Sequence, residues 1–234
     1  MIIEYCLVCD AGILPQVSWT TLFSKENTSH LCTECSGKLE MIKGEACRNC
    51  DRPLANVEPQ YKVEDQCLDC IRWEKDGEWA DMLKKNHSLF IYNEFAQEVI
   101  ARYKYRGDYV LAQAFAPFIN RKLHSITFDI IVLIPLSEER LYERGFNQSE
   151  ALICASGYKP TRLLTRTHAE KQSKKSRSER IHIPQVFHTK ESIPNQRILL
   201  MDDIYTTGST LRHAAKILIE AGAQSVCSLT IARG

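Results

Sequence analysis

The sequence lacks any long hydrophobic run and any excess of charge of one sign. Its longest apolar stretch, Ile130–Leu136, is far shorter than the roughly 20 residues that a membrane-spanning helix needs. The formal net charge is only +1, so affinity for nucleic acid would have to come from a local patch. The first ten residues carry Glu4 and two cysteines and have no basic start before an apolar core. We therefore expect a cytoplasmic protein with no membrane span.

Two nucleotide-binding motifs are also missing. No G-x-x-x-x-G-K-[ST] occurs anywhere in the chain, which excludes a P-loop NTPase. No G-x-G-x-x-G occurs either, which argues against a dinucleotide-binding domain. The chain is therefore not expected to drive an ATP-dependent motor by itself.

Cysteine, by contrast, is abundant. Eight of the 10 cysteines form four Cys-x-x-Cys pairs before residue 71, namely Cys6/Cys9, Cys32/Cys35, Cys47/Cys50 and Cys67/Cys70. In a reducing compartment such pairs favour metal ligation over disulfides, and two pairs complete one tetrahedral zinc site. Redox-active dithiols are the alternative, but four pairs so close together disfavour them. We predict two structural zinc sites, and the spacing permits either sequential or interleaved pairing.

Composition divides the chain near residue 80. Residues 1–75 are rich in cysteine and charge, and a zinc site commonly replaces the core in so small a unit. Residues 80–234 alternate strand-like and helix-like segments, which predicts a parallel α/β sheet with right-handed crossovers. The expected strands are Asp129–Leu136, Arg197–Met201 and Ser225–Ala232, and the expected helices are Glu138–Ala155 and Ser209–Ala221.

The segment Arg197–Leu211 has the most specific pattern, RILLMDDIYTTGSTL. A buried strand leads to Asp202 and Asp203, and a short loop and a helix start follow. The loop residues are Thr206, Thr207, Gly208, Ser209 and Thr210. Free amides and the positive end of a helix suit a phosphate, whereas carboxylates suit the hydroxyls of a ribose. The pattern predicts a site for a sugar 5′-phosphate. An ordinary capped turn is the alternative, but a cap needs only one such hydroxyl residue.

The nine residues from Asp202 to Thr210 resemble the phosphoribosyl pyrophosphate (PRPP) motif of type I phosphoribosyltransferases. Together with the four cysteine pairs and the RGFNQ segment Arg144–Gln148, they make the whole chain similar to the ComF family of competence proteins. This resemblance implies a type I phosphoribosyltransferase-like parallel sheet preceded by an N-terminal double zinc ribbon.

The resemblance also implies roles for individual residues. Asp202, Asp203 and Arg144 are the candidate catalytic residues, Arg140 is a further PRPP contact, and Mg²⁺ would accompany the diphosphate. Residues 165–180 resemble the flexible loop that closes over PRPP, which we expect to be long and mobile. Lys104 and Arg106 match another recurrent ComF segment, to which no role can be assigned. No residue identifies an acceptor, so turnover of PRPP is left open.

The function implied by the resemblance is handling of incoming single-stranded DNA in the cytoplasm during natural transformation, beside an ATP-driven competence translocase (a helicase-type motor) and DNA-processing proteins. A basic segment supplies candidate DNA contacts, although it also fits a plain solvated loop. These contacts are Arg166, Lys171, Lys174, Lys175 and Arg177. Two alternatives stand beside this function. One is a metabolic phosphoribosyltransferase for a nucleobase or amine, and the other is a PRPP-sensing adaptor whose ribbons dock a partner.

Overall fold

The structure is a computed structural model that describes residues 4–13, 30–55, 57–166 and 187–234. The cysteine-rich part contains only short elements, which are β1 (Glu4–Tyr5), β2 (Gly12–Ile13), α1 (Thr33–Lys38), the 3-10 helix η1 (Pro59–Tyr61), β3 (Lys62–Val63), β4 (Gln66–Cys67) and α2 (Leu68–Lys75). The remainder comprises β5 (Lys85–Ile91), α3 (Glu94–Tyr105), α4 (Leu111–Leu123), β6 (Ile130–Leu133), α5 (Glu138–Arg144), α6 (Gln148–Ala155), β7 (Thr165–Arg166), β8 (Phe187–His188), β9 (Arg197–Tyr205), α7 (Ser209–Glu220) and β10 (Ser225–Arg233).

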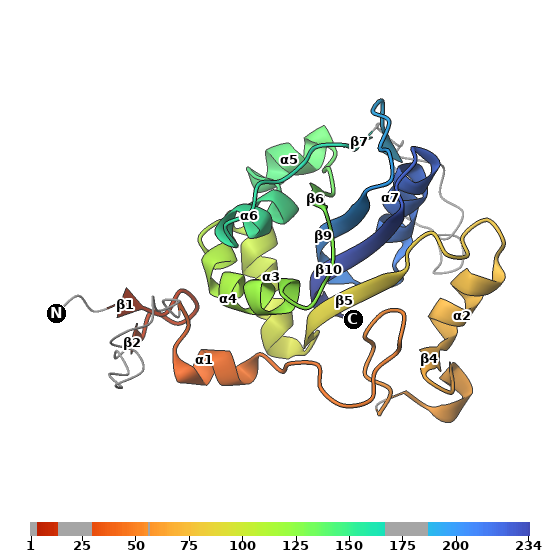
Figure 1. Cartoon of the computed structure of the whole chain (residues 1–234). Coiled ribbons are helices and arrows are strands. Elements are labelled where there is room, and N and C mark those ends of the chain that lie inside the picture. The colour runs from red at the N-terminus through yellow and green to blue at the C-terminus, as the bar shows by residue number, and fades with distance from the viewer. Residues whose placement is uncertain (1–3, 14–29, 56, 167–186) are drawn as a thin grey trace.

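A four-stranded sheet with the order β5-β10-β9-β6 forms the centre of the molecule (Figure 1). All three strand pairings are parallel, which confirms the predicted parallel α/β sheet. The two central strands, β9 and β10, are almost continuously buried, as expected for strands covered on both faces.

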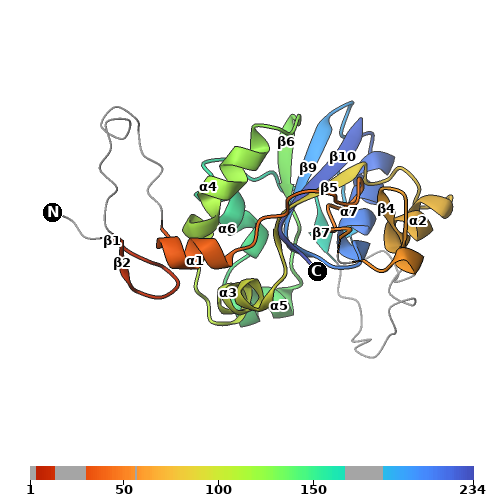
Figure 2. The same ribbon diagram turned by 90° about the horizontal axis from the view of Figure 1, so that it is seen from below.

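The two faces of this sheet are covered by different elements (Figure 2). Helices α3, α4 and α6 pack against one face, where their apolar side chains join Leu199 and Met201 of β9 in one core. Helix α7 covers the other face together with the second group of cysteines, in a core that contains Ile198 and Leu200. Successive side chains of β9 therefore pack alternately into two separate cores.

The cysteine-rich segment crosses from one face to the other along the edge strand β5. The amide of Ile42 donates to the carbonyl of Leu89 at 3.0 Å, and the amide of Ile91 donates to the carbonyl of Glu40 at 2.8 Å. These bonds use backbone groups that an open sheet edge would leave exposed. As a result Cys6 and Cys35 lie in the core beneath α3 and α4, while the later cysteines lie in the core beneath α7.

Two expected elements differ from the structure. The single helix expected over Glu138–Ala155 is two helices, because Gly145 takes a left-handed conformation (φ 75°) that ends α5, and the Asn147 side chain then caps α6. The strand expected to stop at Met201 continues to Tyr205. Asp202 and Asp203 are therefore part of β9 and do not follow it. Of the helices in the described ranges, none combines the length and apolar character required to cross a bilayer.

Candidate functional site and metal centres

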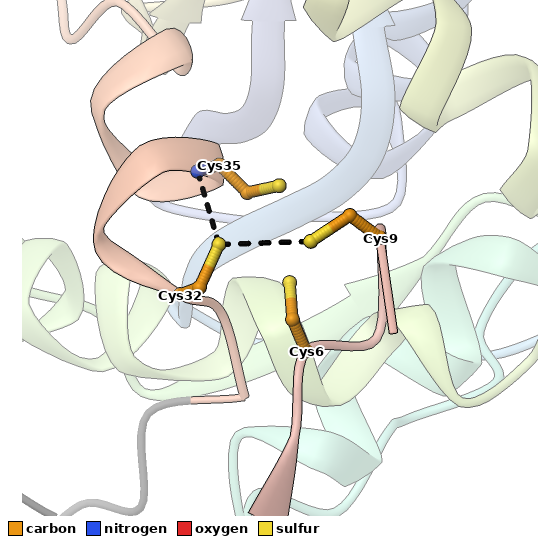
Figure 3. A group of neighbouring side chains, drawn as sticks. All are labelled: Cys6, Cys9, Cys32 and Cys35. Carbon is orange, nitrogen blue, oxygen red and sulfur yellow. Dashed lines mark hydrogen bonds between the residues drawn. The ribbon is translucent and has the colours of Figure 1, made fainter. Parts of the chain in front are cut away.

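The first four cysteines converge on one point (Figure 3). Cys6 and Cys9 lie in the turn between β1 and β2, and Cys32 and Cys35 lie at the start of α1. The sulfur atoms of Cys9 and Cys32 are 3.7 Å apart, and the amide of Cys35 donates to the Cys32 sulfur at 3.4 Å. The turn and the helix start thus present their thiols to each other.

The second four cysteines form a more deeply buried cluster, and all of them are at most 1% exposed. The cluster comprises Cys47, Cys50, Cys67 and Cys70. The sulfurs of Cys50 and Cys67 are 3.7 Å apart, and the amide of Cys67 donates to the Cys47 sulfur at 3.3 Å. Pairing of the Cys-x-x-Cys turns is therefore sequential, and the interleaved alternative is excluded.

Both tetrads fit a tetrahedral metal ion. Within each tetrad the ligand atoms all lie within 4.8 Å of one another. A tetrahedron with metal–sulfur distances of about 2.3 Å has sulfur–sulfur edges of about 3.8 Å, close to the two separations above. Four sulfurs also complete the coordination, so the sites suit a structural metal rather than a catalytic one. Each tetrad could therefore hold one metal ion.

The two acids of β9 have different surroundings. Asp203 is buried and pairs with Lys104 of α3, whose Nζ lies 2.8 Å from Oδ1. The amide of Asp203 also donates to the Asp202 carboxylate at 2.9 Å. Lys104 had no role that the sequence could assign. The structure makes it the counter-ion of Asp203, because α3 packs on the face of the sheet to which Asp203 points.

Asp202 carries a perturbed carboxyl group. Burial first, and then the negative charge of Asp203, raise its pKa from the ordinary 3.8 to about 7. The amide of Asp203 and the cations Lys104 and Arg144 act in the opposite direction. The strand end thus holds one carboxylate paired with a lysine and one carboxyl group that changes its charge near neutral pH. Perturbed carboxyl groups of this kind are typical of binding and catalytic sites.

This pKa predicts a pH-dependent effect of Asp202→Asn on stability. The folded protein binds the proton more tightly than the unfolded chain, so ionisation costs stability as the pH rises from 3.8 to about 7. Asn removes that cost, so the thermal midpoint should increase, by more at pH 8 than at about pH 5.5. Thermal melts of both proteins at the two pH values test this. An equal shift at both pH values would contradict the raised pKa.

The loop between β9 and α7 is held tightly at Gly208. This residue has φ 80°, and a Cβ placed on it would lie 2.1 Å from the Tyr205 hydroxyl, so no side chain fits. Its carbonyl accepts the amide of Arg212 at 2.9 Å and starts α7. Thr206 and Thr210 are exposed, whereas Thr207 and Ser209 are half-buried. The loop therefore brings four hydroxyl groups to the first turn of a helix, as the sequence indicates.

Arginines surround the same strand end. Arg144 of α5 donates to the Gln148 side chain at 2.7 Å, and its positive charge acts on Asp202. Burial lowers the pKa of Arg166 in β7, as do the charges of Arg140 and Arg144, while Asp202 opposes them. The charges on α5, β7 and the end of β9 are therefore close enough to act on one another. Arg166, a candidate DNA contact in the sequence, thus lies within electrostatic reach of Asp202.

The other candidate DNA contacts fall outside the described residues, as does most of the expected closing loop. They are Lys171, Lys174, Lys175 and Arg177. The two described residues of that loop, Thr165 and Arg166, form β7, which pairs antiparallel with β8.

The RGFNQ segment contributes contacts that sequence reasoning missed. Asn147 donates to the carbonyl of Ile134 at 2.9 Å, which ties the start of α6 to the chain just after β6. The Tyr103 hydroxyl donates to the backbone carbonyl of Gln148 at 2.6 Å. These contacts tie the segment that contains Arg144 to the end of β6 and to α3. The only signal in the sequence was the motif itself, which does not show its partners.

Comparison with known proteins agrees with this geometry. A phosphoribosyl transferase domain family matches residues 158–234, which include β9, the loop and α7. Competence protein ComFC of Bacillus subtilis (strain 168) is 37% identical over 233 residues, covering 97% of this chain and 94% of that protein.

Two further relatives extend the comparison. Competence protein ComFC of Streptococcus pneumoniae (strain ATCC BAA-255 / R6) is 34% identical and covers 97% of this chain and 99% of that protein. The DNA utilization protein YhgH of Escherichia coli O157:H7 is 30% identical over 106 residues, which are 42% of this chain and 46% of that protein. With identity above one third along nearly its whole length, this chain belongs to the ComFC family of competence proteins and carries a phosphoribosyltransferase-like domain.

Proposed function

We propose that this protein binds Mg–PRPP at the end of β9 and acts in the cytoplasm on single-stranded DNA that enters the cell during natural transformation. The observation that carries the proposal is the junction of the acid pair with the glycine-constrained loop. There the half-buried Asp202 and the buried Asp203 lie next to a helix start rich in hydroxyl groups. Acids and phosphate-binding groups placed side by side match a ribose 5-phosphate, which carries hydroxyls at one end and a dianion at the other.

Each group around the junction then has a chemical task. Asp202 and Asp203 accept hydrogen bonds from the ribose hydroxyls, and the loop from Thr206 to Thr210 binds the 5′-phosphate. Arg144 and Arg140 face the diphosphate, whose Mg²⁺ needs few protein ligands. Arg166 lies in the same electrostatic neighbourhood, so the charge that would draw DNA toward β7 also favours the diphosphate. The acceptor, if PRPP is turned over, has no recognisable contact.

In this proposal both cysteine tetrads hold zinc. Four thiolates at tetrahedral separations suit Zn²⁺, which has no redox chemistry of its own and serves as a structural cross-link. Cysteines in such number also stay reduced only in a reducing compartment, which supports the cytoplasm as the place of action.

The names of the relatives support the role in DNA uptake. Two are called competence proteins, and a third is called a DNA utilization protein. Because the sequence contains no P-loop, an ATP-driven translocase has to supply the force, and DNA-processing proteins have to receive the strand. The present protein would act on the strand between these two steps.

Calorimetric titration of Mg–PRPP into the full-length protein tests the phosphate site, and a parallel titration follows DNA binding by fluorescence anisotropy. Saturable binding of PRPP and of a single-stranded oligonucleotide would support the proposal. PRPP binding without DNA binding would favour a metabolic enzyme, and a search for pyrophosphate release with nucleobases would then follow. Failure to bind PRPP would refute the assignment of the site.

The basic segment gives a separate prediction about DNA. Neutralising Lys174, Lys175 and Arg177 to Gln should weaken single-stranded DNA binding and reduce its salt dependence. Each lost phosphate contact lowers the slope of log K against log [salt] by about 0.7, so the full change is about 2. Anisotropy titrations at three salt concentrations measure it. Neutralising Lys216, on α7, serves as the control and should leave the slope unchanged. An unaltered slope in the triple variant would exclude this segment as the DNA surface.

A further inference from the structure

The carbonyl groups of the phosphate loop are held from the side of the second cysteine tetrad. Three consecutive carbonyls, those of Tyr205, Thr206 and Thr207, accept hydrogen bonds from two side chains. These two side chains are Arg233, the penultimate residue, and Trp73 of α2. Neither belongs to the phosphate motif, and both are linked to the second tetrad.

Arg233 connects the tetrad to the loop directly. Its Nε and Nη2 each lie 3.3 Å from the Cys50 sulfur, and its Nη1 donates to the carbonyls of Tyr205 at 3.1 Å and Thr206 at 3.0 Å. The residue is only 3% exposed, so its charge requires partners inside the protein. Four thiolates around a divalent ion leave a net negative charge, which supplies one.

Trp73 makes the second connection. It lies three residues after Cys70 on α2, a helix that begins immediately after Cys67. Its indole Nε1 donates to the carbonyl of Thr207 at 2.9 Å, and the ring is 3% exposed. The position of α2, and therefore of this donor, depends on Cys67, which caps the helix, and on Cys70, which lies in its first turn.

Holding these carbonyls orients the loop amides. In a planar trans peptide the C=O of one residue and the N–H of the next point in opposite directions. Fixing the carbonyls of Tyr205, Thr206 and Thr207 on the tetrad side therefore turns the amides of Thr206, Thr207 and Gly208 to the other side. Within the described part of the chain these three amides donate no hydrogen bond, so they remain available to an anion.

The first tetrad has a different anchorage. It lies on the opposite face of the sheet, and the Arg102 side chain of α3 donates to the carbonyls of Leu7 and Val8 in its turn, at 3.3 Å and 2.6 Å. No such bond reaches the phosphate loop from the described residues of this tetrad.

We infer that Trp73 and Arg233 are positioning residues that couple metal binding at the second tetrad to phosphate binding at the loop. The second tetrad then sets the direction of the anion-binding amides, while the first tetrad has no part in this coupling. The inference rests on the proposed phosphoribosyl site for its consequence in binding, but the restraint on the loop itself can be measured without any ligand.

The test compares two matched variants of the full-length, metal-loaded protein. Trp73→Phe removes the donor to Thr207 and keeps a buried ring. Trp79→Phe makes the same chemical change at a neighbouring buried ring whose Nε1 has no hydrogen-bond partner among the residues that the structure describes. Trp73→Phe should weaken Mg–PRPP binding about three- to tenfold, as expected for one net hydrogen bond, whereas Trp79→Phe should not.

Amide exchange measured by NMR reports on the loop in the absence of ligand. The amides of Arg212 and Gly234 donate to Gly208 and Tyr205, so their exchange rates rise when the loop opens more often. Trp73→Phe should accelerate both, and Trp79→Phe neither. If wild-type protein binds no Mg–PRPP, the proposed function fails while this comparison still decides the restraint. Equal exchange in the two variants would overturn the inference.

The affinity of the protein for zinc gives a second test of the coupling. If bound zinc raises the affinity for a phosphate ligand, that ligand must raise the affinity for zinc by the same factor. Ribose 5-phosphate is the probe, since it requires no Mg²⁺ that a chelator would remove. In Cys9→Ser, which lacks the first site, saturating ribose 5-phosphate should increase the affinity for the remaining zinc. Adding Trp73→Phe should reduce that increase. Zinc affinity that ribose 5-phosphate leaves unchanged would overturn the coupling.

Discussion

The double variant Asp202→Asn/Asp203→Asn should lose Mg–PRPP binding by roughly 10²–10⁴-fold in calorimetry. Each carboxylate that accepts a hydrogen bond from a ribose hydroxyl contributes about 1.5–3 kcal/mol, and the losses of two such groups combine to this range. Asp203→Asn also leaves the Lys104 ammonium, which lies 2.8 Å from the present carboxylate, without its counter-ion. The loss should therefore exceed that of either single variant.

The control for this experiment is Asp129→Asn. Asp129 is also an acid beside β9, and it pairs with Arg197 at 2.6 Å, but it is situated at the opposite end of the strand. Its replacement should leave PRPP affinity unchanged. Wild-type affinity in the double variant would remove the ribose-binding role from the acids. Loss of affinity together with loss of metal would instead show that the variant is misfolded, so metal content is measured in the same samples.

Cys47→Ser should cost one metal ion per chain and about 3 kcal/mol or more of unfolding free energy. Cys47 is fully buried and belongs to the same core as Leu200 of β9 and Leu211 of α7. Metal binding in such a site contributes directly to folding, and its loss leaves buried thiols without a partner. Metal analysis by mass spectrometry and urea unfolding followed by circular dichroism measure the two effects.

Cys9→Ser is the matched control, since Cys9 is an exposed ligand of the first tetrad. It should also release one metal ion, but with a smaller loss of unfolding free energy, because its tetrad is less enclosed by the core. Equal losses for the two variants would show that burial does not distinguish the tetrads. Full metal content in Cys47→Ser would refute a metal site at the second tetrad.

Short-range patterns in the sequence predicted a large share of this architecture. The Cys-x-x-Cys turns predicted metal ligands, because two thiols at that spacing face the same way whatever surrounds them. The segment from Arg197 to Leu211 predicted a strand, a loop and a helix start from its apolar run and the hydroxyl-rich residues after it. Alternating β and α segments indicated a parallel sheet, which the pairing of β5, β10, β9 and β6 confirms.

The two wrong predictions concern where a helix and a strand end. Gly145 divides a region of helical periodicity into two helices, since its left-handed conformation ends α5 at a point where apolar spacing alone continues. The extension of β9 to Tyr205 depends on pairing with β10, in which Asp202 faces Thr230 and Tyr205 faces Arg233. Periodicity contains no information about how far a neighbouring strand reaches.

The sequence by itself thus determined the chemical groups of the sites, which are the thiol pairs, the acid pair and the hydroxyl-rich loop. The tertiary structure alone decided which turns share a metal, which tetrad lies on which face, and that Lys104 neutralises Asp203. It also decided that Trp73 and Arg233 hold the phosphate loop, through contacts that span 134 residues to Thr207 and 183 residues to Cys50. Such contacts follow from the order of strands and the packing of helices across the sheet, and no spacing within a single segment encodes them.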